Sequence, residues 1–234
     1  MIGNFLLQIS TTNDLLTAQV TGVQPSQMTL STYDLAVKGG WIMIVLAILS
    51  VMAVYIFIER FMTIKKASQE DKYFMNNIRD FMHSGRLDSA LALCRNNESP
   101  IARMIEKGLN RIGRPLNDIN AAIENIGKLE VARLEKNIAI LATVAGVSPM
   151  LGFLGTVTGM IIAFYDMSMA GNNIDIQILS SGIYQAMVTT VGGLIVGIVS
   201  YVMYNTLVAR IEKLVFILEA RSTEFMDLLH EPVK

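Results

Sequence analysis

The sequence has few of the residue types from which enzymes and disulfide-linked proteins are built. It contains one cysteine, Cys94, and two histidines, His83 and His230, among 234 residues. A lone cysteine suits neither an intrachain disulfide nor a metal site, and neither histidine has a second histidine or a cysteine at helical spacing. The chain also lacks a glycine-rich phosphate loop ending in Lys-Ser or Lys-Thr and a His-Glu-x-x-His pair. We therefore expect no catalytic site, no cofactor and no resident metal.

Charge is scarce as well, and it is unevenly distributed. Only 17% of the residues are charged, 52% are hydrophobic, and the mean hydropathy is +0.46, values typical of membrane proteins. No charged side chain occurs in residues 41–58, 137–165 or 176–209. As a helix the first run would be roughly 27 Å long, just enough to cross a bilayer, and the other two are longer. These runs predict three transmembrane helices.

Lysine and arginine lie almost entirely on one side of the predicted spans. Fourteen fall within residues 59–136 and four after residue 209, whereas residues 1–58 hold one and residues 166–175 hold none. Because basic residues concentrate in cytoplasmic segments, the N-terminus and the short loop are predicted to lie outside. The C-terminus of this multi-pass membrane protein is predicted to be cytoplasmic.

The predicted fold is an all-α membrane protein in which two of the three spans extend into a cytoplasmic helical bundle. The predicted segments are an external N-terminal arm (1–37), spans at 38–59, 138–165 and 178–209, a cytoplasmic helical domain (60–137), a short periplasmic loop (166–177) and a cytoplasmic C-terminal helix (210–234).

Local signals place helix ends within the cytoplasmic domain. The first span is predicted to continue through residues 61–82 and to stop at the small and polar residues 83–85. Ser99 is a good N-cap, and Pro100 suits the first position of the helix that follows. A long helix from Pro115 is predicted to run without a break into the second span.

Small residues form a stripe on each of the two later spans. Gly193 and Gly197 make a Gly-x-x-x-Gly motif, which lets neighbouring helix backbones approach closely in lipid. The stripes are therefore predicted to pack helices together, and by spacing alone they can be packing faces and nothing more. The residues assigned to the stripes and to helix packing or kinking are Pro149, Gly152, Gly155, Thr156 and Gly159 on the second span, with Gly182, Ala186, Thr190, Gly193 and Gly197 on the third.

Hydroxyl groups accompany these stripes. Ser148, Thr156, Thr189 and Thr190 can hold water and pass on a proton, or they can simply bond to a carbonyl one turn back. They cannot store a proton, and no Asp, Glu, His, Lys or Arg lies within residues 137–165 or 176–209. A proton path driven by membrane potential needs a titratable group at depth. If protons cross here, another polypeptide must supply the carboxylate.

Residues 146–160 and 182–194 resemble the second and third membrane helices of the ExbB/TolQ/MotA family of proton-driven motor subunits. The resemblance implies a ring-forming homo-oligomer, typically a pentamer, around a single-span ExbD- or TolR-like partner that carries an essential intramembrane Asp. It also implies that Thr156 and Thr190 line the lumen, that Pro149 is the proline of the second span, and that Gly193 is a small residue of the third-span motif.

One position departs from the family pattern. ExbB and TolQ proteins commonly carry Glu where this chain has Gln185, and an amide cannot titrate at physiological pH. The site residues predicted for a proton path are Ser148, Thr156, Gln185, Thr189 and Thr190.

The resemblance implies an ExbB-like ring subunit of an inner-membrane motor that uses the proton-motive force. With an ExbD-like partner and a TonB-like protein it would energise outer-membrane transport. A TolQ-like role in envelope integrity, a gliding or secretion motor, and a passive membrane scaffold stay open as alternatives. Membrane lipids are predicted partners, because basic residues lie near the span ends; nucleic acid is not.

Overall fold

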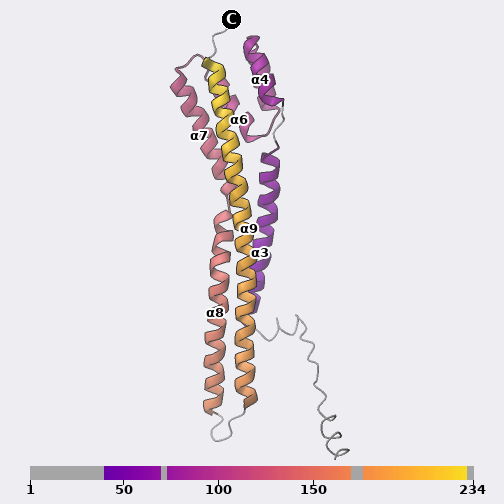
Figure 1. Cartoon of the computed structure of the whole chain (residues 1–234), viewed down its shortest axis with the longest axis vertical. Helices are drawn as coiled ribbons and strands as arrows, with labels where there is room; N and C mark the ends of the chain where they lie inside the picture. Colours follow the sequence, from indigo (N-terminus) through magenta and orange to yellow (C-terminus); the bar gives the residue numbers. More distant parts are fainter. Residues whose placement is uncertain (1–39, 70–72, 170–175, 231–234) are drawn as a thin grey trace, which may run out of the picture. The chain divides into compact units, whose positions relative to one another are not determined.

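The computed structural model describes residues 40–69, 73–169 and 176–230, all within one compact unit, Ala36–Lys234, and every described element is an α-helix (Figure 1). The helices are α3 (Trp41–Ala67), α4 (Phe74–His83), α5 (Leu87–Arg95), α6 (Pro100–Leu109), α7 (Leu116–Glu135), α8 (Ile138–Met169) and α9 (Ile176–His230). The predicted external arm, residues 1–37, lies outside the described residues.

Three helical stretches are long and apolar enough to cross a membrane, and they correspond to the three charge-free runs of the sequence. α3 holds the first, α8 the second and α9 the third. α8 reaches Met169 and α9 begins at Ile176, both within the predicted loop 166–177, whose residues 170–175 lie outside the described part of the chain. All-helical architecture with three candidate spans is confirmed.

α9 is continuous over 55 residues. At ~1.5 Å per residue it is roughly 80 Å long, far more than the ~30 Å hydrocarbon core needs. No proline occurs in residues 176–230, and the helix continues through the adjacent glycines Gly192 and Gly193. The predicted third span (178–209) and C-terminal helix (210–234) therefore form one helix over the described residues.

The second predicted continuous helix is wrong in one place, because α7 ends at Glu135 and α8 begins at Ile138. Asn137 has φ of 65°, a left-handed conformation that Asn tolerates better than most residues. In an unbroken helix the Asn137 amide would bond to the Arg133 carbonyl. Instead the Arg60 guanidinium of α3 donates to this carbonyl through Nη1 at 3.2 Å. A side chain from another helix thus replaces the local hydrogen bond at the break.

The helix that holds the first span was predicted to continue to residue 82, but it ends earlier. α3 stops at Ala67, where the Ser68 amide donates to the carbonyls of Ile64 and Lys66, and α4 begins only at Phe74. The sequence Ser68–Lys72 contains no apolar side chain. A helical turn there would bury nothing, and short helical segments without tertiary packing are marginal in water.

The other predicted helix ends are confirmed. Ser99 caps α6 by accepting a hydrogen bond from the Ala102 amide at 3.2 Å, and Pro100 is the first helical residue. α4 ends before Gly85, and the chain turns again at Gly113; both glycines have positive φ.

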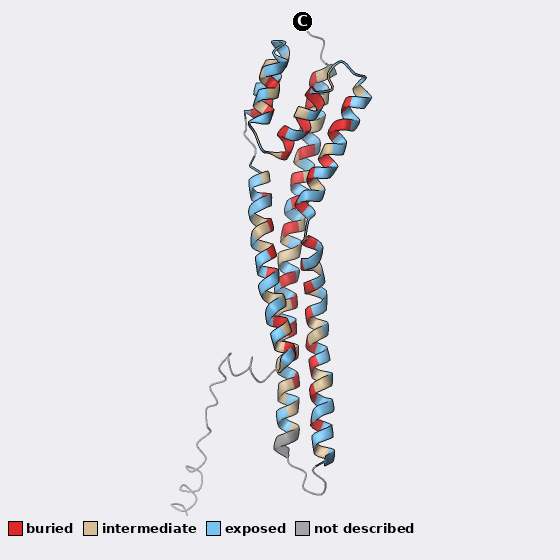
Figure 2. Cartoon of the chain, turned by 180° about the vertical axis from the view of Figure 1, so that it is seen from behind, coloured by how far each residue is buried: buried red, intermediate tan, exposed pale blue. Residues whose placement is uncertain are grey.

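The largest buried side chains of helices α4, α6 and α7 pack against the C-terminal half of α9. Phe74 and Ile78 of α4, Ile105 of α6, Ile123 of α7 and Phe225 of α9 are at most 2% exposed. They belong to one apolar cluster, and Figure 2 shows the buried residues along the facing sides of these helices. This cluster holds the bundle of helices α4–α7, called the α4–α7 bundle below, on α9.

Candidate functional site

The candidate site is the contact between α8 and the part of α9 that runs beside it from Ile176 onward (Figures 1 and 2). We call it the α8–α9 seam, and its buried small residues are Gly152, Gly155 and Gly159 on α8 with Ala186, Gly193 and Gly197 on α9. A Cβ on Gly193 would lie 2.6 Å from the Ser148 carbonyl oxygen and 2.8 Å from the Gly152 Cα. The two backbones are therefore in direct contact.

Other glycines make room for specific neighbours across the seam. Gly155 faces the Thr189 side chain, and a Cβ on Gly159 would lie 3.1 Å from the Ala186 Cβ. Gly197 accommodates the Pro149 ring, whose Cγ would be 2.5 Å from an added Cβ. α8 continues through Pro149. The two predicted stripes thus face each other within one chain.

The three threonine hydroxyls of the seam are bonded to backbone carbonyls. Thr190 Oγ1 donates across the seam to the Gly152 carbonyl oxygen at 3.1 Å. Thr189 and Thr156 donate within their own helices, to Ala186 at 2.7 Å and Phe153 at 2.6 Å. A hydroxyl that donates its proton keeps lone pairs that can accept another hydrogen bond. Within a protomer, the threonines are therefore set up as acceptors.

Exposure separates these hydroxyls into two groups. Ser148 and Thr189 are 0% and 1% exposed, so they lie inside the protomer. Thr156 and Thr190 are half-buried and reach its surface. Ser148 Oγ is buried and has no hydrogen-bond partner among the described residues. Only Thr156 and Thr190 can meet a partner helix without a rearrangement of the seam.

Gln185 does not lie with the other residues predicted for a proton path, Ser148, Thr156, Thr189 and Thr190. Its Nε2 atom would be 2.8 Å from a Cβ on Gly40, the N-cap residue of α3. Gly40 has φ of 69°, so both its backbone conformation and this close approach favour glycine. The structure therefore places the Gln185 amide against the start of the first span. Sequence spacing on α9 alone carries no signal of this contact.

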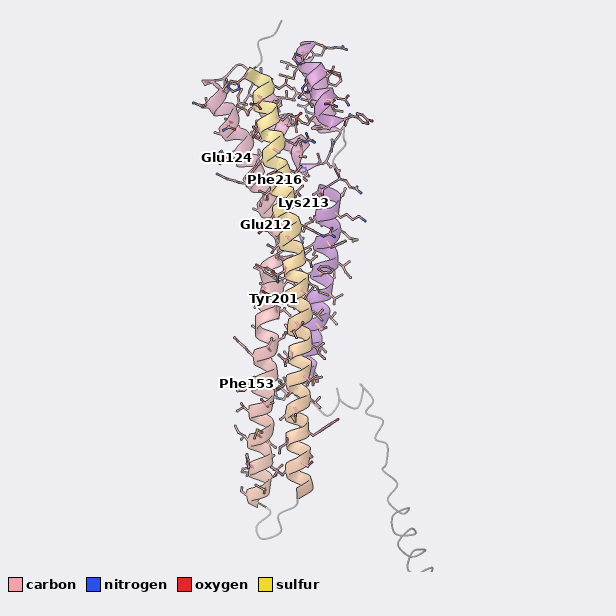
Figure 3. The ribbon with its side chains drawn as sticks, viewed as in Figure 1. Glu124, Phe153, Tyr201, Glu212, Lys213 and Phe216 are labelled. Carbon is pink, nitrogen blue, oxygen red and sulfur yellow. The ribbon has the colours of Figure 1, made fainter. Side chains whose placement is uncertain are left out.

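The outer surfaces of α8 and α9 are apolar. Phe153 on α8 and Tyr201 on α9 are among the exposed large side chains (Figure 3), as are Ile161, Met187 and Ile198. Such a surface suits lipid or other membrane helices, and residues 138–165 of α8 and 176–209 of α9 contain none of the charge that an aqueous surface would need.

A second polar group, missed by the sequence analysis, lies where α3, α6 and α7 meet. Glu130 is buried and accepts hydrogen bonds from Arg103 of α6 at 3.2 Å and Arg133 at 2.6 Å. Helical spacing made the pairing of Glu130 with Arg133 predictable. The burial of Glu130 and the participation of Arg103 were not predictable from that spacing. A signal was available: Glu130 shares a helix face with Ile123, Gly127 and Leu134, which are apolar and buried.

Comparisons with known proteins agree on a family. The family model described as the MotA/TolQ/ExbB proton channel family matches residues 96–220, more than half of the chain. A protein of Methanothermobacter thermautotrophicus named as a biopolymer transport protein ExbB homolog is 26% identical over 176 residues, 75% of this chain and 62% of its own length.

Shorter matches have higher identity. An ExbB-like 2 biopolymer transport protein of Helicobacter pylori is 37% identical over 106 residues, 45% of this chain and 64% of that protein. The Tol-Pal system protein TolQ of Haemophilus influenzae is 36% identical over 101 residues, 43% of this chain and 44% of that protein. The chain thus spans less than two thirds of each of these relatives.

Proposed function

The chain belongs to the MotA/TolQ/ExbB proton channel family, and from this premise we propose that it is the ring-forming subunit of an inner-membrane motor driven by the proton-motive force. Copies of the chain, five in the arrangement we favour, surround a single-span ExbD- or TolR-like partner. In each copy of the chain, the N-terminus and the loop between α8 and α9 lie in the periplasm, and α4–α7 lie in the cytoplasm.

The observation that carries this proposal is a pair of closely packed membrane helices with hydroxyls but no charged side chain over residues 137–165 and 176–209. Without a titratable group at depth, the chain cannot itself hold a proton in transit. A carboxylate on the partner helix supplies that group. The division of labour is a lumen wall from this chain and a proton carrier from the partner.

The chemistry of the wall gives the carboxylate two environments. A protonated, neutral Asp can face the apolar side chains of the ring interior, whereas a charged Asp requires polar contacts or water. Thr156 and Thr190 are the half-buried hydroxyls of the seam, and they serve the protonated Asp rather than the charged one. Because their protons are already donated to carbonyls, they can accept a hydrogen bond from the protonated carboxyl. Alternation between the two environments on successive subunits would drive relative rotation.

The output follows from the partner's external domain. We favour an ExbB-like output, in which an ExbD-like partner and a TonB-like protein energise transport across the outer membrane. A TolQ-like role in envelope integrity is the second candidate, and the TolQ relative of similar identity supports it as well. A gliding or secretion motor would use the same mechanism. In a passive scaffold, the candidate from another class, the seam would serve assembly alone.

The substitution Thr156→Val tests the motor against the scaffold, because Val keeps the shape and removes the hydroxyl. Thr158→Val is a matched control: Thr158 lies on the same helix and its Oγ1 likewise donates to a carbonyl within that helix, that of Leu154, at 2.7 Å. We expect Thr156→Val to lower proton flux in liposomes containing chain and partner by at least about a hundredfold, the low end of what a positioned proton-transfer group contributes. Native mass spectrometry should show an unchanged assembly.

Equal flux in the wild type and in both variants would contradict the proton path and favour the scaffold. Equal loss in both variants would show that the position of Thr156 is not special. Thr190→Val is less clean, because it also removes the bond across the seam to Gly152.

A further inference from the structure

A polar pocket lies where the first span leaves the membrane, and the proposed motor does not use it. It has a volume of about 750 Å³ and lies between the end of α3, the turn before α6, and α7. Three cationic side chains from three helices line it: Lys66 of α3, Arg103 of α6 and Arg133 of α7. We call it the boundary pocket.

Its depth along the chain matches the headgroup layer. The charge-free run of the first span ends at Ile58, and Thr63, which lines the pocket, lies about 7.5 Å further along a helix. Arg133 lies four positions before Asn137, where the second run begins. The headgroup region extends about 5–8 Å beyond the hydrocarbon on each side. Lys66 is deeper in the cytoplasm, but its long side chain can reach back.

The pocket carries a net positive charge. Its three cations face two carboxylates, Glu98 and Glu130. Glu130 is buried and satisfied by both arginines, so it is not available to a further ligand. Glu98 is exposed and pairs with Lys66 at 2.9 Å. A surface ion pair of this kind is weak, and an anionic ligand can displace it.

Donors remain available on all three cations. Arg133 donates to Glu130 through Nη1, and Lys66 donates to Glu98 with one of its three protons. Arg103 donates through Nη1 to Glu130 and through Nη2 to the Glu98 carbonyl, which leaves three of its five N–H donors available. The Arg133 side chain is 66% exposed, so its second edge faces the open pocket. Apolar atoms of Ala67 and Leu134 complete the lining.

We propose that the boundary pocket binds the phosphate of an anionic phospholipid from the cytoplasmic leaflet. The chemistry it recognises is a phosphate ester held by Lys66 and Arg133, and a lipid is the source because the pocket lies at headgroup depth. Bound lipid ties the end of α3 to α7 next to the break at Asn137. The inference rests on the membrane placement given above and is independent of proton transfer.

The test uses the full chain purified in mild detergent and stripped of lipid. Soluble short-chain phosphatidylglycerol, phosphatidylcholine of the same chain length, and inorganic phosphate are titrated separately while Tm is measured, since a ligand of the native state raises Tm. We expect phosphatidylglycerol alone to raise Tm at the concentrations used. An equal effect of phosphatidylcholine would overturn a charge-selective site. An equal effect of inorganic phosphate would overturn the lipid as the source.

Two substitutions with opposite signs locate the site. Lys66→Gln should weaken phosphatidylglycerol binding about tenfold, the loss expected for one charged hydrogen bond. Its matched control is Lys128→Gln: Lys128 is similarly exposed and pairs with Glu124 at 2.7 Å, but lies outside the pocket. Glu98→Gln frees Lys66 and should tighten binding about two- to fivefold.

Equal weakening in Lys66→Gln and Lys128→Gln would overturn the pocket as the site, and so would weaker binding in Glu98→Gln. Because no partner and no membrane potential are involved, failure of this test leaves the proposed motor untouched. Loss of proton flux in Thr156→Val would likewise say nothing about the lipid.

Discussion

The α8–α9 seam and the α4–α7 bundle are held together by different kinds of contact within one chain. In the seam, glycines bring backbone against backbone, as where a Cβ on Gly193 would lie 2.6 Å from the Ser148 carbonyl oxygen. In the bundle, large side chains fill the space between helices, and Phe225, Ile105 and Ile123 are at most 1% exposed. α9 belongs to both regions, so one helix changes its mode of packing along its length.

The surroundings of the two regions explain the difference, because lipid surrounds the seam and water surrounds the bundle. Lipid tails are as apolar as Leu, so burying large aliphatic side chains between membrane helices gains little, and close van der Waals contact has to hold the helices. In water, removing apolar surface is itself favourable, at roughly 25 cal/mol per Å².

A glycine in the bundle illustrates the contrast. A Cβ on Gly108 of α6 would lie 2.7 Å from Phe225 Cε1 and 2.8 Å from Ile123 Cδ1. Its neighbours are side-chain ends, whereas Gly152 and Gly193 of the seam face backbone atoms. Side-chain ends can move aside and backbone in a packed helix cannot. A substitution in the seam is therefore less able to relax.

The largest effect is expected in the bundle, from Phe225→Ala. Truncating a buried Phe costs about 3–5 kcal/mol of unfolding free energy. Alkylation of Cys94 provides a readout, because it is buried in the same cluster. Burial, with a smaller contribution from Glu106, raises the pKa of the Cys94 thiol to about 12. Only the thiolate reacts, so at pH 8 the native protein should label very slowly.

We expect Phe225→Ala to accelerate this labelling strongly as the bundle opens. The control is Phe216→Ala, since Phe216 is also on α9 but 72% exposed (Figure 3). Equal labelling rates in the two variants would mean that Phe225 does not anchor the bundle.

A smaller loss is expected in the seam, from Gly193→Ala. The added Cβ meets backbone atoms of Ser148 and Gly152, and overpacking of this kind costs about 1–3 kcal/mol. Gly146→Ala on α8 is the control, because no neighbouring atom lies within 4 Å of an added Cβ there. Thermal unfolding in detergent should show a lower Tm for Gly193→Ala and an unchanged or slightly higher one for Gly146→Ala. Similar values for both would argue against a backbone-packed seam.

The smallest change should come from the seam's unpaired hydroxyl. Ser148→Ala removes a buried group without a hydrogen-bond partner among the described residues, so stability should stay level or rise by about 1 kcal/mol. Thr189→Val removes a buried hydroxyl that is bonded to the Ala186 carbonyl, and should cost about 0.6 kcal/mol. Tm measured in detergent compares the two. An equal loss in both would show that Ser148 has a partner in the membrane.

Much of the fold could be predicted because its signals are local. Charge-free runs marked α3, α8 and α9, and Ser99 with Pro100 marked the start of α6. Neither signal depends on another part of the chain, since a span is defined by its own length and polarity and a cap by its own side chain. The break at Asn137 had no comparable signal, because it depends on Arg60, 77 positions earlier in the sequence.

The candidate site divides in the same way. Sequence spacing alone determined that small residues form one stripe on each span, since helical periodicity is a local property, and composition determined that no carboxylate lies between residues 137 and 165 or 176 and 209.

Only the tertiary structure decided that the stripes meet each other within one chain, that Ser148 and Thr189 lie inside the protomer while Thr156 and Thr190 reach its surface, and that Gln185 lies against Gly40. The physical reason is that a helix repeat specifies which residues share a face, whereas contact with a second helix specifies what that face meets.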